Sequence, residues 1–265
     1  MEGCSCLRCD RDPLFEVTEG IGTMDLFQAV LLILVGMGAG FVQRVSGFGL
    51  GIFAMMFLPH FLPSHTAAAT VSTLFSCVTS VYNGVKYRKN VAVRTALPML
   101  CAALVSIPVG VYFSVAVSGE IFEILLGAVL IVLSVYFLFF SQRVRMKATA
   151  ANGALAGALG GGLNGLFSTG GPPVVLYLSH ALQDKNAYFA TIQFYFGVTN
   201  LYSVASRAAG GLVTGQVLLF AAVGIAGCMA GDFAGRMVFD RLDGGKLRLV
   251  IYIGMILSGI SMILS

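Results

Sequence analysis

The chain has 265 residues, of which 57% are hydrophobic and only 11% are charged. A soluble domain carries about 25% charged residues, so this composition excludes an ordinary soluble protein and predicts a polytopic membrane protein. The net charge of +4 does not indicate a nucleic-acid partner, because in a membrane protein the distribution of charge among loops matters more than its total.

Residues 1–23 form a polar tail of mixed charge. The tail lacks a basic start followed by an apolar core, so we do not interpret it as a signal peptide. Cys4, Cys6 and Cys9 offer three thiols, but a fourth ligand and a partner motif are missing. We therefore expect incidental thiols, with no metal site and no cofactor.

Apolar runs predict five helical elements in residues 24–141 and five more in residues 148–265. The first set covers residues 25–42, 50–59, 64–85, 95–117 and 120–140, and the second covers 148–167, 172–182, 186–209, 214–236 and 246–264. The run 50–59 would be about 15 Å long as a helix, half of a bilayer. We predict an all-α membrane domain made of two five-element repeats.

Each predicted repeat contains a glycine-rich break that separates a long apolar run from a short one. The first break reads Gly40-Phe-Val-Gln-Arg-Val-Ser-Gly-Phe-Gly-Leu-Gly51, and the second reads Gly162-Leu-Asn-Gly-Leu-Phe-Ser-Thr-Gly-Gly-Pro-Pro173. A shift of 122 positions places Ser46 on Ser168 and Gly49 on Gly171. Two interrupted helices in corresponding halves of a membrane protein are typical of a transporter's binding site.

The basic residues predict the topology. If the elements alternate across the membrane, one face receives Lys86, Arg88, Lys89, Arg94, Arg143, Arg145, Lys147, Lys185, Arg236, Arg241, Lys246 and Arg248. The opposite face receives Arg207 and two arginines of the tail, so the first face is predicted to be cytoplasmic and both termini extracytoplasmic. Since each half has an odd number of elements, the two repeats are predicted to be inverted.

The breaks predict a site for a small anion. Short helices that begin near the middle of the membrane expose unpaired N–H groups and the positive end of the helix dipole, and glycine allows a ligand to approach the backbone. Two such ends directed at one place favour an anion. The candidate substrate-binding residues at the breaks are Ser46, Gly47, Gly49, Ser168, Thr169, Gly170 and Gly171.

Two charged residues in or beside apolar runs each allow two interpretations. Arg44 could bind the anion through its planar fork, or it could extend to the cytoplasmic face as an interfacial anchor. Asp232 could carry a coupling proton, or it could form a helical ion pair with Arg236 four residues later, and we favour the ion pair.

Three uncharged polar residues also interrupt apolar runs: Asn164, Gln193 and Asn200. Each is a candidate for lining the substrate path, although a hydrogen bond between helices is the default explanation. Gln193 and Asn200 are seven residues apart and therefore share a helix face.

The chain carries no G-x-S-x-G, P-loop or H-E-x-x-H motif, so we do not expect an enzyme. The segment from Gln43 to Gly51 with the downstream Pro59, and the segment from Gly162 to Pro173, resemble the two signature breaks of the TauE/SafE family. The resemblance extends over about residues 25–264 through length and repeat layout. It implies the export of small sulfur-containing anions.

The sequence thus predicts a secondary transporter in the cell membrane that exports sulfite, sulfoacetate or another organosulfonate by alternating access. The expected partners are the substrate anion and the lipid bilayer, with a homodimer as an option. Two alternatives stay open: a passive anion channel of the same fold, and a membrane scaffold or receptor that transports nothing.

Overall fold

The computed structural model describes residues 24–136, 147–238 and the isolated positions 253, 256, 259, 260 and 263. In this part of the chain every regular element is helical, which confirms the predicted all-α class. The elements are α2 (Leu26–Ser46), α3 (Leu50–Phe57), η1 (Leu58–His60), α4 (His65–Lys86), η2 (Arg88–Asn90), α5 (Val93–Ala116), α6 (Gly119–Val135), α7 (Ala150–Phe167), α8 (Gly171–Ala181), α9 (Lys185–Ala209) and α10 (Gly215–Val238). The predicted tail with its cysteines, Arg143, Arg145, Arg241, Lys246 and Arg248 lie outside the described residues.

The observed helices match the predicted runs closely, with one instructive difference. We predicted that the first run ends at residue 42, but α2 continues to Ser46. Gly40, which the prediction places in the break, lies within α2. There it serves close helix packing, because its Cβ position is occupied by the backbone of Cys228. The helix ends where Gly47 adopts a left-handed backbone with φ of 81° and donates its N–H to the Gln43 carbonyl.

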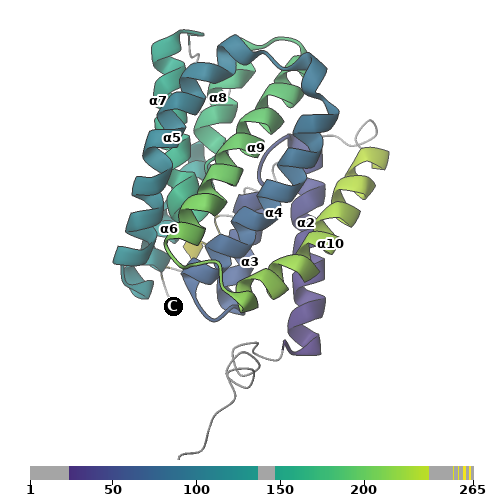
Figure 1. Ribbon diagram of the computed structural model, residues 1–265, viewed down its shortest axis with the longest axis vertical. Coiled ribbons are helices and arrows are strands. Elements are labelled where there is room, and N and C mark those ends of the chain that lie inside the picture. The colour runs from purple at the N-terminus through teal and green to yellow at the C-terminus, as the bar shows by residue number, and fades with distance from the viewer. Residues whose placement is uncertain are drawn as a thin grey trace, which may run out of the picture.

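The helices of the two halves interlock (Figure 1). The most extensive packing joins α5 to α7 on one flank and α2 to α10 on the other, and α4 packs against α9 between these flanks. In each half, therefore, the first helix packs on the fourth helix of the other half, and the third helices pack on one another. The short helices α3 and α8 lie inside this frame, next to α4 and α9 respectively.

Glycines set the distance between these paired helices. A Cβ built on Gly36 would lie 2.3 Å from the Gly224 carbonyl oxygen, and one on Gly40 would lie 2.1 Å from that of Cys228. On the other flank, a Cβ on Gly165 would lie 2.3 Å from the Ile107 carbonyl oxygen. Because lipid provides no hydrophobic force between helices, such close backbone contact is a main source of their association.

Three of the described helices are long and apolar enough to cross a membrane by length and composition: Leu26–Ser46, Val93–Ala116 and Gly215–Met237. Large apolar side chains also cover the outer surface, and Val105 and Tyr112 of α5 are 74% and 71% exposed. A surface of this kind suits contact with lipid rather than water.

The close helix contacts yield a stability prediction with a matched control. Gly40→Ala and Gly161→Ala should each lower the melting temperature of the detergent-purified protein, because the added methyl group meets the backbone of Cys228 or Ala103 and overpacking costs about 1–3 kcal/mol. Gly162→Ala should leave it unchanged or slightly raised, since nothing lies within 4 Å of its Cβ position and alanine is the better helix former. Equal losses at positions 161 and 162 would contradict this account.

Candidate substrate site at the two helix breaks

Each break consists of three non-helical residues. In the first, Gly47, Phe48 and Gly49 separate α2 from α3, and in the second, residues 168–170 separate α7 from α8. Gly47 and Ser168 both end their helices with a positive φ, of 81° and 60° respectively. Ser168 is the one non-glycine residue with a positive φ in the described part of the chain, and this uncommon conformation is typical of a functional site.

The helix ends define the equivalent positions of the two breaks. Gly47 and Ser168 are the C-cap residues of the long helices, so they correspond to each other. Gly49 and Gly170 are the N-cap residues of the short helices and correspond in the same way. Aligning the two breaks by their helix ends therefore shifts the first by 121 positions, from 47 to 168. Aligning them by identical residues shifts it by 122 positions. In the corrected register Gln43 is the counterpart of Asn164.

The two breaks lie directly against each other. A Cβ built on Gly51 would lie 1.8 Å from the Ser168 carbonyl oxygen, so no other residue fits at position 51 without displacing backbone. From the other side, the Cβ position of Gly171 is 3.3 Å from the ring of Phe48. Glycine thus allows the start of α3 and the start of α8 to meet.

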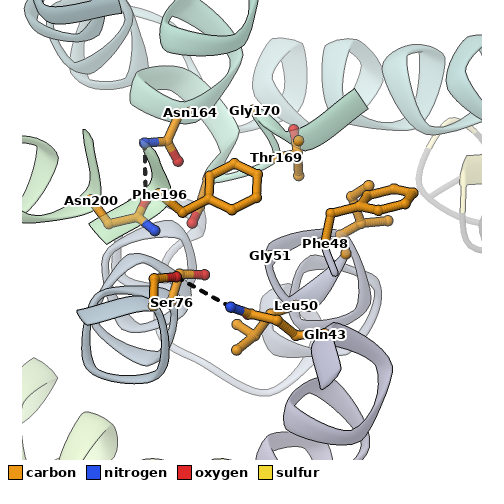
Figure 2. Close-up of a pocket in the computed structure, with 15 residues that line it drawn as sticks. Gln43, Phe48, Leu50, Gly51, Ser76, Asn164, Thr169, Gly170, Phe196 and Asn200 are labelled. Atoms are coloured by element: carbon orange, nitrogen blue, oxygen red, sulfur yellow. Dashed lines mark hydrogen bonds between the residues drawn. The ribbon is translucent and has the colours of Figure 1, made fainter. Parts of the chain in front are cut away.

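A small cavity of about 20 Å³ lies where the breaks meet. A space of this size holds about one water molecule, so in this conformation it has no room for a sulfonate. Figure 2 shows Gln43 reaching the cavity from one side and Asn164 from the opposite side. The lining residues are Gln43, Phe48, Gly49, Leu50, Gly51, Ile52, Ser76, Ser80, Asn164, Ser168, Thr169, Gly170, Gly171, Phe196 and Asn200.

Amide side chains join the breaks to α4 and α9. Gln43 is 3% exposed, and its Nε2 donates to Ser80 Oγ at 3.2 Å and to Gln193 Oε1 at 3.1 Å. Gln193 Nε2 in turn donates to the Gly47 carbonyl oxygen at 3.2 Å. On the equivalent side, Asn164 Nδ2 donates to Asn200 Oδ1 at 3.0 Å (Figure 2). Each long helix is therefore tied to α9 by one amide close to its break.

The cavity is rich in hydrogen-bond donors and its lining carries no charged side chain. The hydroxyl groups of Ser168 and Thr169 are buried and have no hydrogen-bond partner among the described residues. Neither caps α8, which begins at Gly171 and has Gly170 as its N-cap residue, without a side-chain hydrogen bond. Buried hydroxyls without partners are costly, so these two are available to donate to a water molecule or a ligand in the cavity.

The two short helices do not contribute equally to this donor set. The first turn of α3 has a free N–H on each of Leu50, Gly51 and Ile52. The first turn of α8 contains Pro172 and Pro173, which have no N–H. The start of α3 therefore provides more backbone donors than the start of α8, and on the second side the hydroxyls of the break take a larger share.

The structure brings most of the predicted site residues together and leaves three out. Those that line the cavity are Gly49, Asn164, Ser168, Thr169, Gly170, Gly171 and Asn200. Gln193 is one hydrogen bond away, on Gln43. The Ser46 hydroxyl bonds the Val42 and Phe48 carbonyl oxygens, and Gly47 faces Gln193 with its carbonyl group, so neither lines the cavity.

Arg44 does not line the cavity either. Its Nη2 donates to the Tyr87 hydroxyl at 3.0 Å, and its guanidinium lies over the Phe189 ring with 4.9 Å between the guanidinium carbon and the ring centre. Tyr87 follows α4 at the start of the basic segment with Arg88 and Lys89. This geometry corresponds to the anchoring interpretation of Arg44.

Asp232 forms the helical ion pair that its spacing predicts. Its carboxylate accepts from Arg236 and from Asn83 Nδ2 at 3.1 Å. Arg236 Nη2 also donates to Asn83 Oδ1 at 3.2 Å. These bonds join the three side chains at the end of α4 that lies beyond the Gln43–Gln193 contact, and the Nε of Arg236 takes no part in them.

The sequence interpretation missed several residues of this region. Gln43 was read as part of a motif and not as a site residue, although the corrected register pairs it with Asn164. Ser76 and Ser80 of α4 carry no motif, but they lie four residues apart and so share a helix face. From the sequence, Arg207 was used only as a loop charge on the extracytoplasmic side, but its side chain is completely buried, and its seven-residue spacing from Asn200 was the available signal.

The amino-acid sequence was compared with known protein families, curated proteins and solved structures. The family described as "Sulfite exporter TauE/SafE" matches residues 32–262, nearly the whole chain and both breaks. Neither the curated proteins nor the solved structures give a match. The family match and the apolar helices together show a membrane protein of the transporter class. The chain belongs to the TauE/SafE sulfite exporter family.

Proposed function

We propose that this chain is a secondary transporter that exports a small sulfur-containing oxyanion, such as sulfite, sulfoacetate or another organosulfonate. The observation that carries the proposal is the uncharged cavity at which the two breaks meet, with the unpartnered hydroxyls of Ser168 and Thr169 and the N-terminal donors of α3. Donors without nearby carboxylates suit an anion, because helix N-termini and hydroxyls stabilise negative charge.

Alternating access of two inverted repeats, residues 24–141 and 148–265, is the mechanism we propose. It is supported by the reciprocal packing, in which α2 pairs with α10 and α5 with α7, and by the shared helix geometry of the two breaks. The cavity of about 20 Å³ is too small for a sulfonate, so binding and release require the flanks to move relative to α4 and α9. The breaks are the natural hinges of this movement.

Export is the proposed direction for this multi-pass protein of the cell membrane, and the membrane potential supports it. With the interior negative, the membrane potential favours the exit of an anion by about 2.3 kcal/mol per charge for each 100 mV. The cavity of about 20 Å³ favours a carrier over a channel, because an open channel would contain a continuous path for the anion. Saturable flux with counterflow in proteoliposomes supports the carrier, and ohmic single-channel currents support the channel.

The first prediction concerns the hydroxyl of Thr169. Thr169→Val should weaken the stabilisation of the protein by sulfite or sulfoacetate and reduce flux about 10- to 100-fold, the factor expected for one hydrogen bond to a charged group. The melting temperature without substrate should stay the same, because this hydroxyl has no partner among the described residues. Measurements are thermal shift over a panel of oxyanions and proteoliposome flux.

Thr199→Val is the matched control for this experiment. Thr199 lies on α9, is equally buried, and its hydroxyl donates to the Tyr195 carbonyl oxygen at 2.8 Å within its own helix. Its removal should leave substrate binding and flux unchanged. If both variants lose flux equally, the Thr169 hydroxyl has no special role; if no oxyanion stabilises the wild type or is transported by it, the proposed function is wrong.

A second prediction separates the two interpretations of Arg44. We propose that it anchors α2 to Tyr87 and Phe189. Arg44→Ala should lower the melting temperature, since a partly buried cation–π contact contributes about 1 kcal/mol, and should leave the affinity for the transported anion within about twofold. A folded Arg44→Ala protein that has lost anion binding would instead make Arg44 a substrate ligand.

A third prediction concerns Asp232, which we propose to be a structural partner of Arg236 and not a proton carrier. Asp232→Asn should lower the melting temperature, because a partly buried arginine loses its carboxylate. The ratio of anion flux with and without an imposed pH gradient should equal that of the wild type. If the flux ratio differs from one in the wild type and equals one in Asp232→Asn, proton coupling would be assigned to this residue.

A further inference from the structure

Arg207 is the most deeply buried charged side chain in the described part of the molecule. It lies in the last turn of α9 and is 0% exposed. Two other arginines have buried nitrogen atoms, but their side chains are only partly buried. Arg236 also pairs with Asp232, and Arg44 lies on two aromatic rings. Burying a charge of this kind costs several kcal/mol unless it is matched by an opposite charge.

The partners of Arg207 do not provide that match. Its Nη2 donates to the Gly165 carbonyl oxygen at 2.6 Å, and its Nη1 donates to Thr70 Oγ1 at 3.3 Å. Both acceptors are neutral. Within the residues that the structure describes, no carboxylate lies at ion-pair distance from Arg207, and its buried Nε has no acceptor.

A purely structural role accounts for one of these bonds. The Gly165 carbonyl is in the last turn of α7, where carbonyl groups lack helical partners and arginine is a common cap. A cap, however, uses one or two N–H groups and leaves the rest of the guanidinium in water. Complete burial of five donors against two neutral acceptors costs more than the cap contributes.

The position of Arg207 connects it to the break site. Gln193, Asn200 and Arg207 recur at intervals of seven along α9, so they share one face. Asn200 bonds Asn164 at the cavity, and Arg207 bonds Gly165, the next residue of α7. Seven residues of helix correspond to about 10 Å, and an arginine side chain leans back toward the helix N-terminus, in this case toward Asn200.

We propose that Arg207 forms a second anion-binding station, next to the break site and on the side of the C-terminal end of α9. The free Nε edge of its guanidinium would bind two oxygens of a small planar or pyramidal oxyanion, such as a sulfite, a sulfonate or a carboxylate, in a bidentate manner. An anion that moves from the break cavity to this station would gain the full positive charge of the Arg207 guanidinium. This inference rests on the proposed transport function and names the residue that provides its charge selectivity.

The test compares Arg207→Met and Arg207→Lys with the wild type. Arg207→Met should fold with an equal or higher melting temperature, because replacing an unmatched buried charge by an apolar side chain of similar length is often neutral or stabilising. Its flux of sulfite or sulfoacetate in proteoliposomes should fall at least tenfold. Arg207→Lys retains the charge without the fork, so its flux should lie between those of Arg207→Met and the wild type.

Arg88→Met is the matched control, since it removes the same charge from an exposed position in η2 and should leave flux unchanged. A lower melting temperature with normal flux in Arg207→Met makes Arg207 a structural cap and overturns the inference while the proposed function stands. If Arg207→Met does not fold, wild-type flux in Arg207→Lys overturns the bidentate station, and reduced flux supports it. A wild type that neither binds nor transports any oxyanion overturns both proposals.

Discussion

The contact between Gly51 and the Ser168 carbonyl group is the constraint on which the centre of the molecule depends. In a bilayer, irregular backbone is tolerated only where it is enclosed by protein, and each break provides part of the enclosure of the other. The contact requires glycine at position 51, where any side chain would overlap backbone. It also brings the N-terminal ends of α3 and α8 to one cavity, so the feature that makes the breaks stable is also the one that collects their hydrogen-bond donors.

The order and limits of the helices could be predicted from the sequence because they depend on local properties: apolar runs, glycine breaks and prolines. The register of the breaks could not, since identical letters align at one shift and helix ends at another. One residue corresponds to about 100° of rotation on a helix. In the structural register Gln43 and Asn164 are equivalent, and each bonds an amide side chain of α9, which no local pattern indicates.

The two arginines show the same limit in another form. Arg44 attracted attention because it stands beside a break in the sequence, yet it lies against Tyr87 and Phe189 and does not line the cavity. Arg207 stands far from both breaks in the sequence, yet it bonds the residue that follows Asn164. Whether an arginine reaches a lipid headgroup or a protein interior is decided by the helices that cover it, and this packing of α9 against α4 and α7 is a property of the tertiary structure.

The charges along the contact of α4 with α9 are arranged so that the field favours an anion. At one end Asp232 is paired with Arg236 and bonded by Asn83, so this cluster contributes little net charge. The middle contains amide and hydroxyl side chains. These groups are uncharged, so they do not repel an anion, and they provide hydrogen-bond donors. At the other end Arg207 has no carboxylate within ion-pair distance in the described structure. In a low-dielectric interior an unmatched cation acts over many ångströms, so the proposed station at Arg207 would add a positive field to a cavity whose lining carries no charge.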